Sequence, residues 1–270
     1  MIEITLADGF GNQIQNHAHE SRAHLLIKNE YTHGAQIRFA GNSPFLWVQV
    51  DQAIAPALLY LPKGIFTYEI PQGDERLAYP PQAFSGESHL VRAWLPAKEE
   101  MTAKRRNLAL NPADQRKDAN AYPHVTANVE TRGEAVFAAR NVIDGALENT
   151  FHGEWPYQSW GIGARDDAWC KLEFGRPVKV WDMALVLRAD FPHDAYWTQG
   201  KVVLSDGTEI SFMLTRTGDP QHVPLGGRTV TWLRLEGLVK SDDPSAFPAL
   251  TEWQVCGEET KAAEACGISL

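Results

Sequence analysis

Two short loops in the second half of the chain combine aromatic, imidazole and charged side chains. Aromatic rings offer a flat surface to the C–H face of a sugar ring, and the polar groups can hydrogen-bond to its hydroxyls. The candidate saccharide contacts are His152, Trp155, Tyr157, Trp160, Arg188, Asp190, His193 and Trp197. We expect the two loops to meet, because loops at one end of a β-sandwich cluster even when they are distant in sequence.

The same side chains also have a structural interpretation. The chain has nine tryptophans, too many for all of them to be ligand platforms, and tryptophans in loops often plug the ends of a sandwich. Arg188 and Asp190 share strand parity, so they could form a buried ion pair that fixes the second loop. At these positions ligand contact and core packing both remain open.

A catalytic interpretation uses residues from the same loops. His152, Glu154, Asp190, His193 and Asp194 are of the types that act as general acids, bases or metal ligands. The chain contains no HExxH, GxSxG, P-loop or GxGxxG motif, so spacing gives no support to catalysis. We therefore expect no catalytic residues, and keep a hydrolase that acts on a saccharide as the alternative.

Composition restricts the classes of partner. The net charge is −9, and the content of 44% hydrophobic and 22% charged residues is typical of a globular chain. The one basic cluster, residues 104–106, follows two glutamates and is expected to be a solvated linker, so we expect no nucleic-acid partner. No apolar run reaches the length of a membrane span, and no leader precedes the alternation that starts at Ile2, so a cytoplasmic location is expected.

Short period-two patterns separated by turn residues predict an all-β fold of two β-sandwich, jelly-roll-like domains. The expected domains are residues 1–96 and 107–257, joined by a charged linker at 97–106 and followed by a tail at 258–270. The expected strands of the first domain are residues 24–31, 35–40, 45–51, 58–61, 64–70 and 89–95. The expected strands of the second are residues 169–174, 178–188, 200–204, 209–214, 229–235 and 250–256, with a short helix near 135–142.

The N-terminal part contains one further pattern. Gly11, His17 and His19 match the start of a cupin metal motif, and two histidines at this spacing share one face of a strand. The remainder of that motif is missing, so we expect a surface loop without a metal.

The C-terminal part resembles the discoidin-like, galactose-binding-like family, which includes coagulation factor 5/8 type C domains and related carbohydrate-binding modules. The matching segments are residues 107–109, 141–145, Trp160, 169–175 and 250–257. Residues 113–121 replace the usual Thr/Ser-rich stretch, and the loop 152–161 is unusually aromatic. The resemblance implies an antiparallel jelly roll with binding loops at one end.

The resemblance also implies a structural Ca²⁺ near the Asp-Gly loop, held in part by a glutamate of the last strand. The matching positions are Asp144 and Glu252, with Asn149 as a nearby oxygen donor. A hard cation that prefers six to eight oxygens suits this set. The alternative is that Asp144 caps a turn and Glu252 pairs with a basic residue.

The expected function is non-catalytic recognition of a saccharide or glycan through the end loops. A protein-interaction module is a further alternative, because discoidin-like sandwiches also bind proteins and lipid headgroups. The sugar, the oligomeric state and the role of residues 1–96 remain open.

Overall fold

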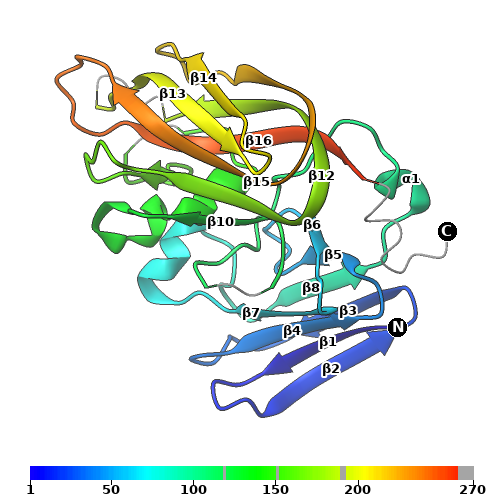
Figure 1. Ribbon diagram of the computed structural model, residues 1–270. Coiled ribbons are helices and arrows are strands. Elements are labelled where there is room, and N and C mark those ends of the chain that lie inside the picture. The colour runs from blue at the N-terminus through cyan, green and yellow to red at the C-terminus, as the bar shows by residue number, and fades with distance from the viewer. Residues whose placement is uncertain (118–119, 150–151, 189–192, 261–270) are drawn as a thin grey trace.

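The computed structural model describes residues 1–117, 120–149, 152–188 and 193–260. Strands dominate, and no helix of the described residues is longer than six residues, so the all-β prediction is confirmed. Within these ranges no helix is long and apolar enough to span a bilayer. Figure 1 shows the N-terminal sheets in blue beside the C-terminal sheet, which runs from green to red.

The N-terminal part is a sandwich of two four-stranded antiparallel sheets, ordered β2-β1-β4-β7 and β3-β8-β5-β6. Alternate residues of β1, such as Ile2 and Ile4, are buried, which is the burial expected where one face of a strand packs on a core. The elements are β1 (Ile2–Ala7), β2 (Gln13–His19), β3 (Arg22–Ile27), β4 (Gln36–Gly41), β5 (Phe45–Gln49), β6 (Ala57–Tyr60), β7 (Ile65–Glu69), η1 (Gly73–Ala78) and β8 (His89–Trp94).

Strand β2 corrects the expectation of a surface loop at His17 and His19. It is an edge strand that is largely exposed on both faces, so it lacks the alternation that marks a half-buried strand. The Nδ1 atoms of both histidines accept backbone N–H groups, from His24 at 3.1 Å and from Arg22 at 3.2 Å. These rings therefore fix the short connection between β2 and β3, which lie in different sheets.

The C-terminal part is one folded antiparallel sheet around a second core, with the main order β11-β16-β12-β15-β13-β14. The long strand β12 pairs with β10 near its start and with β16 over the rest of its length. The elements are α1 (Lys98–Met101), β9 (Arg106–Asn107), β10 (His124–Ala127), η2 (Thr131–Gly133), η3 (Ala135–Phe137), η4 (Ala139–Ile143), β11 (Trp160–Gly161), β12 (Cys170–Leu187), β13 (Trp197–Leu204), β14 (Glu209–Met213), β15 (Gln221–Lys240) and β16 (Ala249–Glu259).

Two local expectations differ from the structure. The strands expected at 169–174 and 178–188 form the single strand β12, which bends at Gly175, where φ is +68° and an added Cβ would lie 2.3 Å from the Tyr122 ring. The helix expected at 135–142 is two 3₁₀ turns separated by Ala138 in an extended conformation. The Asn141 side chain donates to the Ala135 carbonyl at 2.9 Å, so a side chain competes for a carbonyl that a continuous helix would use.

The two parts pack against each other. The N-terminal core includes Ala113, Ala121 and Ala135 from beyond the expected boundary. Tyr60 and Tyr122 exchange backbone hydrogen bonds of 2.8 and 3.0 Å across the interface. Independent folding of the two parts therefore remains a prediction for proteolysis to test.

A buried ionic cluster also joins the parts. Glu259, at the end of β16, binds Arg176 (Nε to Oε2, 2.8 Å) and Arg106. The Arg176 guanidinium lies 5.0 Å from the Phe45 ring centre and 5.1 Å from that of Tyr60, both in the N-terminal part. Since β16 includes Glu258 and Glu259, the last strand extends past the expected start of the tail.

Candidate functional site

The two predicted loops meet at one end of the C-terminal sheet. Arg188 donates from Nη2 to His152 Nδ1 at 2.6 Å, and the centres of the His152 and His193 rings are 4.4 Å apart. The predicted proximity of these loops is thereby confirmed. Asp190 lies outside the described residues.

Arg188 is the fixed centre of this site. Its side chain is almost fully buried, and Asp194, which is also buried, lies 3.3 Å away as an ion-pair partner. The guanidinium carbon lies 5.8 Å from the Phe137 ring centre and 6.0 Å from that of Tyr157. A buried guanidinium needs a compensating charge, and Asp194 supplies it, so the end of β12 holds a preorganised cation.

The hydrogen bonds determine how the two histidines can be protonated. A guanidinium only donates, so His152 Nδ1 is an acceptor and the ring proton lies on Nε2. His193 Nδ1 lies 3.1 Å from a carboxylate oxygen of Asp194, which only accepts, so this nitrogen carries a proton. In its neutral form His193 therefore has Nε2 as an acceptor. The site thus combines a donor from His152 with an acceptor from His193.

These residues line a hollow of about 130 Å³, here called the end-loop hollow. Its wall includes Phe247, which is 50% exposed, and His193, whose side chain is 47% exposed. The other lining residues are Thr131, Arg132, Phe137, His152, Gly161, Ile162, Gly163, Ala164, Arg188, Asp194, Pro248 and Ala249. An exposed ring beside fixed donors and acceptors can contact both the apolar face and the hydroxyls of one sugar residue.

The predicted aromatic contacts do not all lie at the end-loop hollow. Tyr157 packs beside His152, with ring centres 6.0 Å apart, and burial raises the pKa of its hydroxyl, which stays protonated at neutral pH. The predicted saccharide contacts at Trp160 and Trp197 are wrong, because both side chains are fully buried in the C-terminal core and present no ring face to a ligand. Trp155 is 39% exposed but faces a separate small hollow that Ala53 and Tyr79 also line.

Sequence reasoning missed two contributors to this site and gave a third another role. Phe137 lies in η3 and Phe247 lies in the loop before β16, while Asp194, considered only for catalysis, is the described partner of Arg188. The position of Asp194 beside His193 was a usable signal. Phe247 follows no periodic pattern, so its role is visible only in three dimensions. Glu154, considered for catalysis, is exposed and does not line the hollow.

The residues predicted for Ca²⁺ lie together. Glu252 is buried and accepts the Gly145 backbone N–H at 3.2 Å, while Asp144 accepts that of Ala146 at 2.9 Å. Asn149, the third predicted ligand, donates from its side-chain amide to the Thr251 hydroxyl at 3.3 Å. Within the described ranges no group of three or more His, Cys, Asp or Glu side chains is arranged to hold a metal ion, so further ligands at this pair would be amide or carbonyl oxygens.

The electrostatics of this pair fit a cation. Burial raises the pKa of Asp144 to about 6, against the charge of nearby Arg140. Burial and then the charge of Asp144 raise the pKa of Glu252 well above its ordinary range. Among the described residues Glu252 Oε1 has no hydrogen-bond partner. A buried carboxylate oxygen without a donor, next to a second carboxylate, suits a hard divalent ion.

No protein-family model matches the chain, and no curated protein sequence matches it. Solved structures do match about half of it. A mutant of chitosan-binding module 1 from a Paenibacillus chitosanase/glucanase is 23% identical, covers 57% of this chain and 99% of its own, and has a TM-score of 0.39. A Streptococcus pneumoniae fucose-binding module is 12% identical over 56% of this chain and 96% of its own, also with a TM-score of 0.39.

The lectin domain of lectinolysin, solved with Lewis B antigen, is 13% identical over 57% of this chain and 97% of its own, with a TM-score of 0.41. These neighbours are sugar-binding modules of the class that the C-terminal motifs resemble. At these identities and TM-scores the likeness concerns the fold and carries no argument about the ligand.

Proposed function

We propose that the protein recognises a saccharide, without catalysis, through the end-loop hollow. The observation that carries this proposal is the fixed Arg188 beside the His152–His193 pair. These groups place a fixed cation and two imidazole rings within one small hollow, and Nε2 of neutral His193 is an acceptor. Sugar hydroxyls both donate and accept, so they can satisfy such a mixed set.

Binding of a single sugar residue is expected to be modest. Each hydrogen bond contributes about 1 kcal/mol net, and stacking on an exposed ring contributes on the order of 1 kcal/mol. Phe247 is the exposed ring best placed for stacking, because it is half exposed on the wall of the hollow. Three or four such contacts sum to about 3–4 kcal/mol, which corresponds to an affinity in the millimolar range.

We also propose a structural Ca²⁺ at Asp144 and Glu252, with oxygen from Asn149 and backbone carbonyls. When bound, the ion would neutralise the two carboxylates. Asp144 accepts a hydrogen bond from Gln158 at 3.4 Å, and Gln158 belongs to the first binding loop. A cation at this position would therefore stabilise the base of that loop, while ligand contact remains with the end-loop residues.

A glycan array followed by titration calorimetry tests the proposal. His193→Ala should weaken binding of any positive glycan about tenfold, a loss of about 1.4 kcal/mol. The matched control is His222→Ala, because His222 is exposed and also pairs with an aspartate, Asp182, on another surface. Equal affinity for the parent protein and His193→Ala would refute the proposal.

Two further measurements address the alternatives. The His193–Asp194 pair is a feature that a hydrolase could also use, so release of reducing sugar from each positive glycan is measured in parallel. If the parent protein releases reducing sugar and His193→Ala does not, the proposal of non-catalytic binding would be replaced by that of a hydrolase. An array without any positive glycan, combined with capture of a protein partner that depends on His193, would favour the interaction module.

A further inference from the structure

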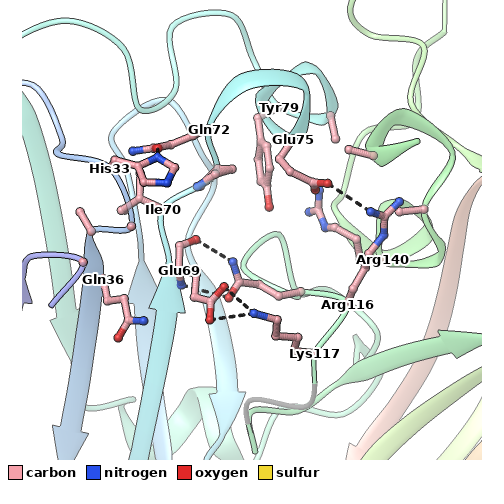
Figure 2. Close-up of a pocket in the computed structure, with 18 residues that line it drawn as sticks. His33, Gln36, Glu69, Ile70, Gln72, Glu75, Tyr79, Arg116, Lys117 and Arg140 are labelled. Atoms are coloured by element: carbon pink, nitrogen blue, oxygen red, sulfur yellow. Dashed lines mark hydrogen bonds and ion pairs between the residues drawn. The ribbon is translucent and has the colours of Figure 1, made fainter. Parts of the chain in front are cut away.

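A larger cleft lies where the N-terminal and C-terminal parts meet, and it is here called the interface cleft. Its volume is about 580 Å³, within the range of small-molecule sites and well above that of the end-loop hollow. In Figure 2, His33 and Gln72 lie on one side, Arg116 and Arg140 on the other, and Glu69 and Lys117 lie below Tyr79. Both parts of the chain therefore build this cleft.

Hydrogen bonds fix the polar groups of the N-terminal wall. His33 Nδ1 lies 2.6 Å from Gln72 Oε1, and Gln72 Nε2 donates to the Thr32 carbonyl at 2.8 Å. The amide oxygen only accepts, so His33 Nδ1 carries a proton and Nε2 of the neutral ring is an acceptor. This wall thus offers an oriented imidazole although His33 is exposed.

The opposite wall is fixed by contacts that cross between the parts. The Gln115 side chain accepts the Glu69 backbone N–H at 3.1 Å and donates to its carbonyl at 2.7 Å. Arg116 binds Glu75 at 3.2 Å and Glu130 at 2.8 Å. These contacts therefore hold the C-terminal wall of the cleft in a fixed position relative to the end of β7.

The charges of the cleft are matched in pairs. Glu69 pairs with Lys117 at 3.0 Å and Glu75 pairs with Arg116, while the charge of Arg140 is opposed by Asp144 behind the wall. A charged ligand would have to displace one of these pairs. A neutral ligand rich in hydroxyls can bond to Oε2 of half-exposed Glu75 without displacing any pair, because Arg116 binds Oε1 of this carboxylate.

A buried donor adds a second feature. Arg140 is almost fully buried in the cleft wall, and its guanidinium carbon lies 4.6 Å from the Tyr79 ring centre. Within the described part of the chain its Nε has no hydrogen-bond partner. We propose that the interface cleft is a second saccharide site, which takes a short neutral oligosaccharide and gives the N-terminal part a role in recognition.

This proposal is independent of the end-loop hollow, and its test separates the two sites. A variant carrying His152→Ala and His193→Ala, here called the background protein, removes binding at the end-loop hollow. Its ligands are cello-, manno-, malto- and chito-oligosaccharides of about two to six units, together with an oligogalacturonate as the acidic counterpart. Titration calorimetry then measures affinity and stoichiometry.

In this background at least one neutral oligosaccharide should bind with one site per chain. Adding His33→Ala and Glu75→Ala should weaken that binding about tenfold or more. The matched control adds His222→Ala and Glu209→Ala, because Glu209 (59% exposed) and Glu75 (58% exposed) each form an exposed ion pair. Both variants remove only exposed side chains, so equal unfolding midpoints are expected.

Three outcomes would overturn the proposal. The first is that no neutral oligosaccharide binds to the background protein. The second is that the cleft variant and its control bind equally well. The third is that only the oligogalacturonate binds, which would mean that an acidic ligand displaces the ion pairs.

Discussion

Replacement of Glu259 by glutamine should strongly destabilise the protein, because this carboxylate joins two guanidinium groups at the interface. The side chains of Glu259 and Arg176 are 3% and 4% exposed, so water cannot replace the lost charge. Removing one partner of a buried ion pair costs about 3–5 kcal/mol. At about 2–4 °C per kcal/mol for a chain of this size, the melting temperature should fall by about 6–20 °C.

The adjacent residue supplies a matched control. Glu258 is more exposed and lies 3.7 Å from Lys179, so Glu258→Gln should cost about 0–1 kcal/mol. Thermal and urea unfolding of both variants measure the difference. Equal losses of unfolding free energy in Glu259→Gln and Glu258→Gln would refute the reasoning.

The pH dependence provides a second check on Glu259. Burial alone would raise the pKa of Glu259, but hydrogen bonds from Arg176 and the charges of Arg176 and Arg106 outweigh it and hold the pKa below its ordinary value. A carboxyl with a lowered folded-state pKa stabilises the fold above its unfolded pKa of about 4.3 and loses that contribution as the pH falls through the folded value. The difference in the free energy of unfolding between the parent and Glu259→Gln should therefore be largest at neutral pH and should disappear in acid.

Three other outcomes are expected. Millimolar Ca²⁺ should raise the melting temperature more at about pH 7.5 than at about pH 5, because the raised pKa values of Asp144 and Glu252 make protons compete with the ion. The absence of a shift in melting temperature at both pH values, or an equal shift in Asp144→Ala, would contradict the site. Trp155→Ala should leave the affinity of the end-loop hollow within about twofold of the parent in calorimetry, because its ring faces another hollow; a tenfold loss would place it at the ligand. Limited proteolysis should cut first within residues 104–106, and gel filtration will test whether the packed interface keeps the two fragments together.

The sequence was sufficient for the elements with a strong local pattern. Alternation located most core strands, among them those expected at 200–204 and 209–214, which meet at a tight turn with Gly207 at a φ of +85°. Strand β2 was missed because an edge strand exposed on both faces has no hydrophobic period. The 3₁₀ turns at 135–143 are accompanied by side-chain hydrogen bonds from Asn141 to the carbonyls of Ala135 and Ser159, which helix propensity does not encode.

The candidate site was predictable to a similar extent. Residue types identified the two loops, and His152, Arg188 and His193 do converge. Types alone could not distinguish a loop tryptophan that fills the core, such as Trp160, from one that stays exposed. The interface cleft has no sequence signature, because its walls come from segments that are distant in the chain and meet only through packing.

The contact between Gln115 and Glu69 also bears on self-association. Strand β7 lies at an edge of its sheet, and an unpaired edge is a template for strand addition by another copy of the chain. The Gln115 amide occupies both the N–H and the C=O of Glu69, as a neighbouring strand would. The same side chain that shapes the cleft wall thus protects this edge against aggregation, so sequence changes that reshape the cleft at Gln115 are constrained by solubility.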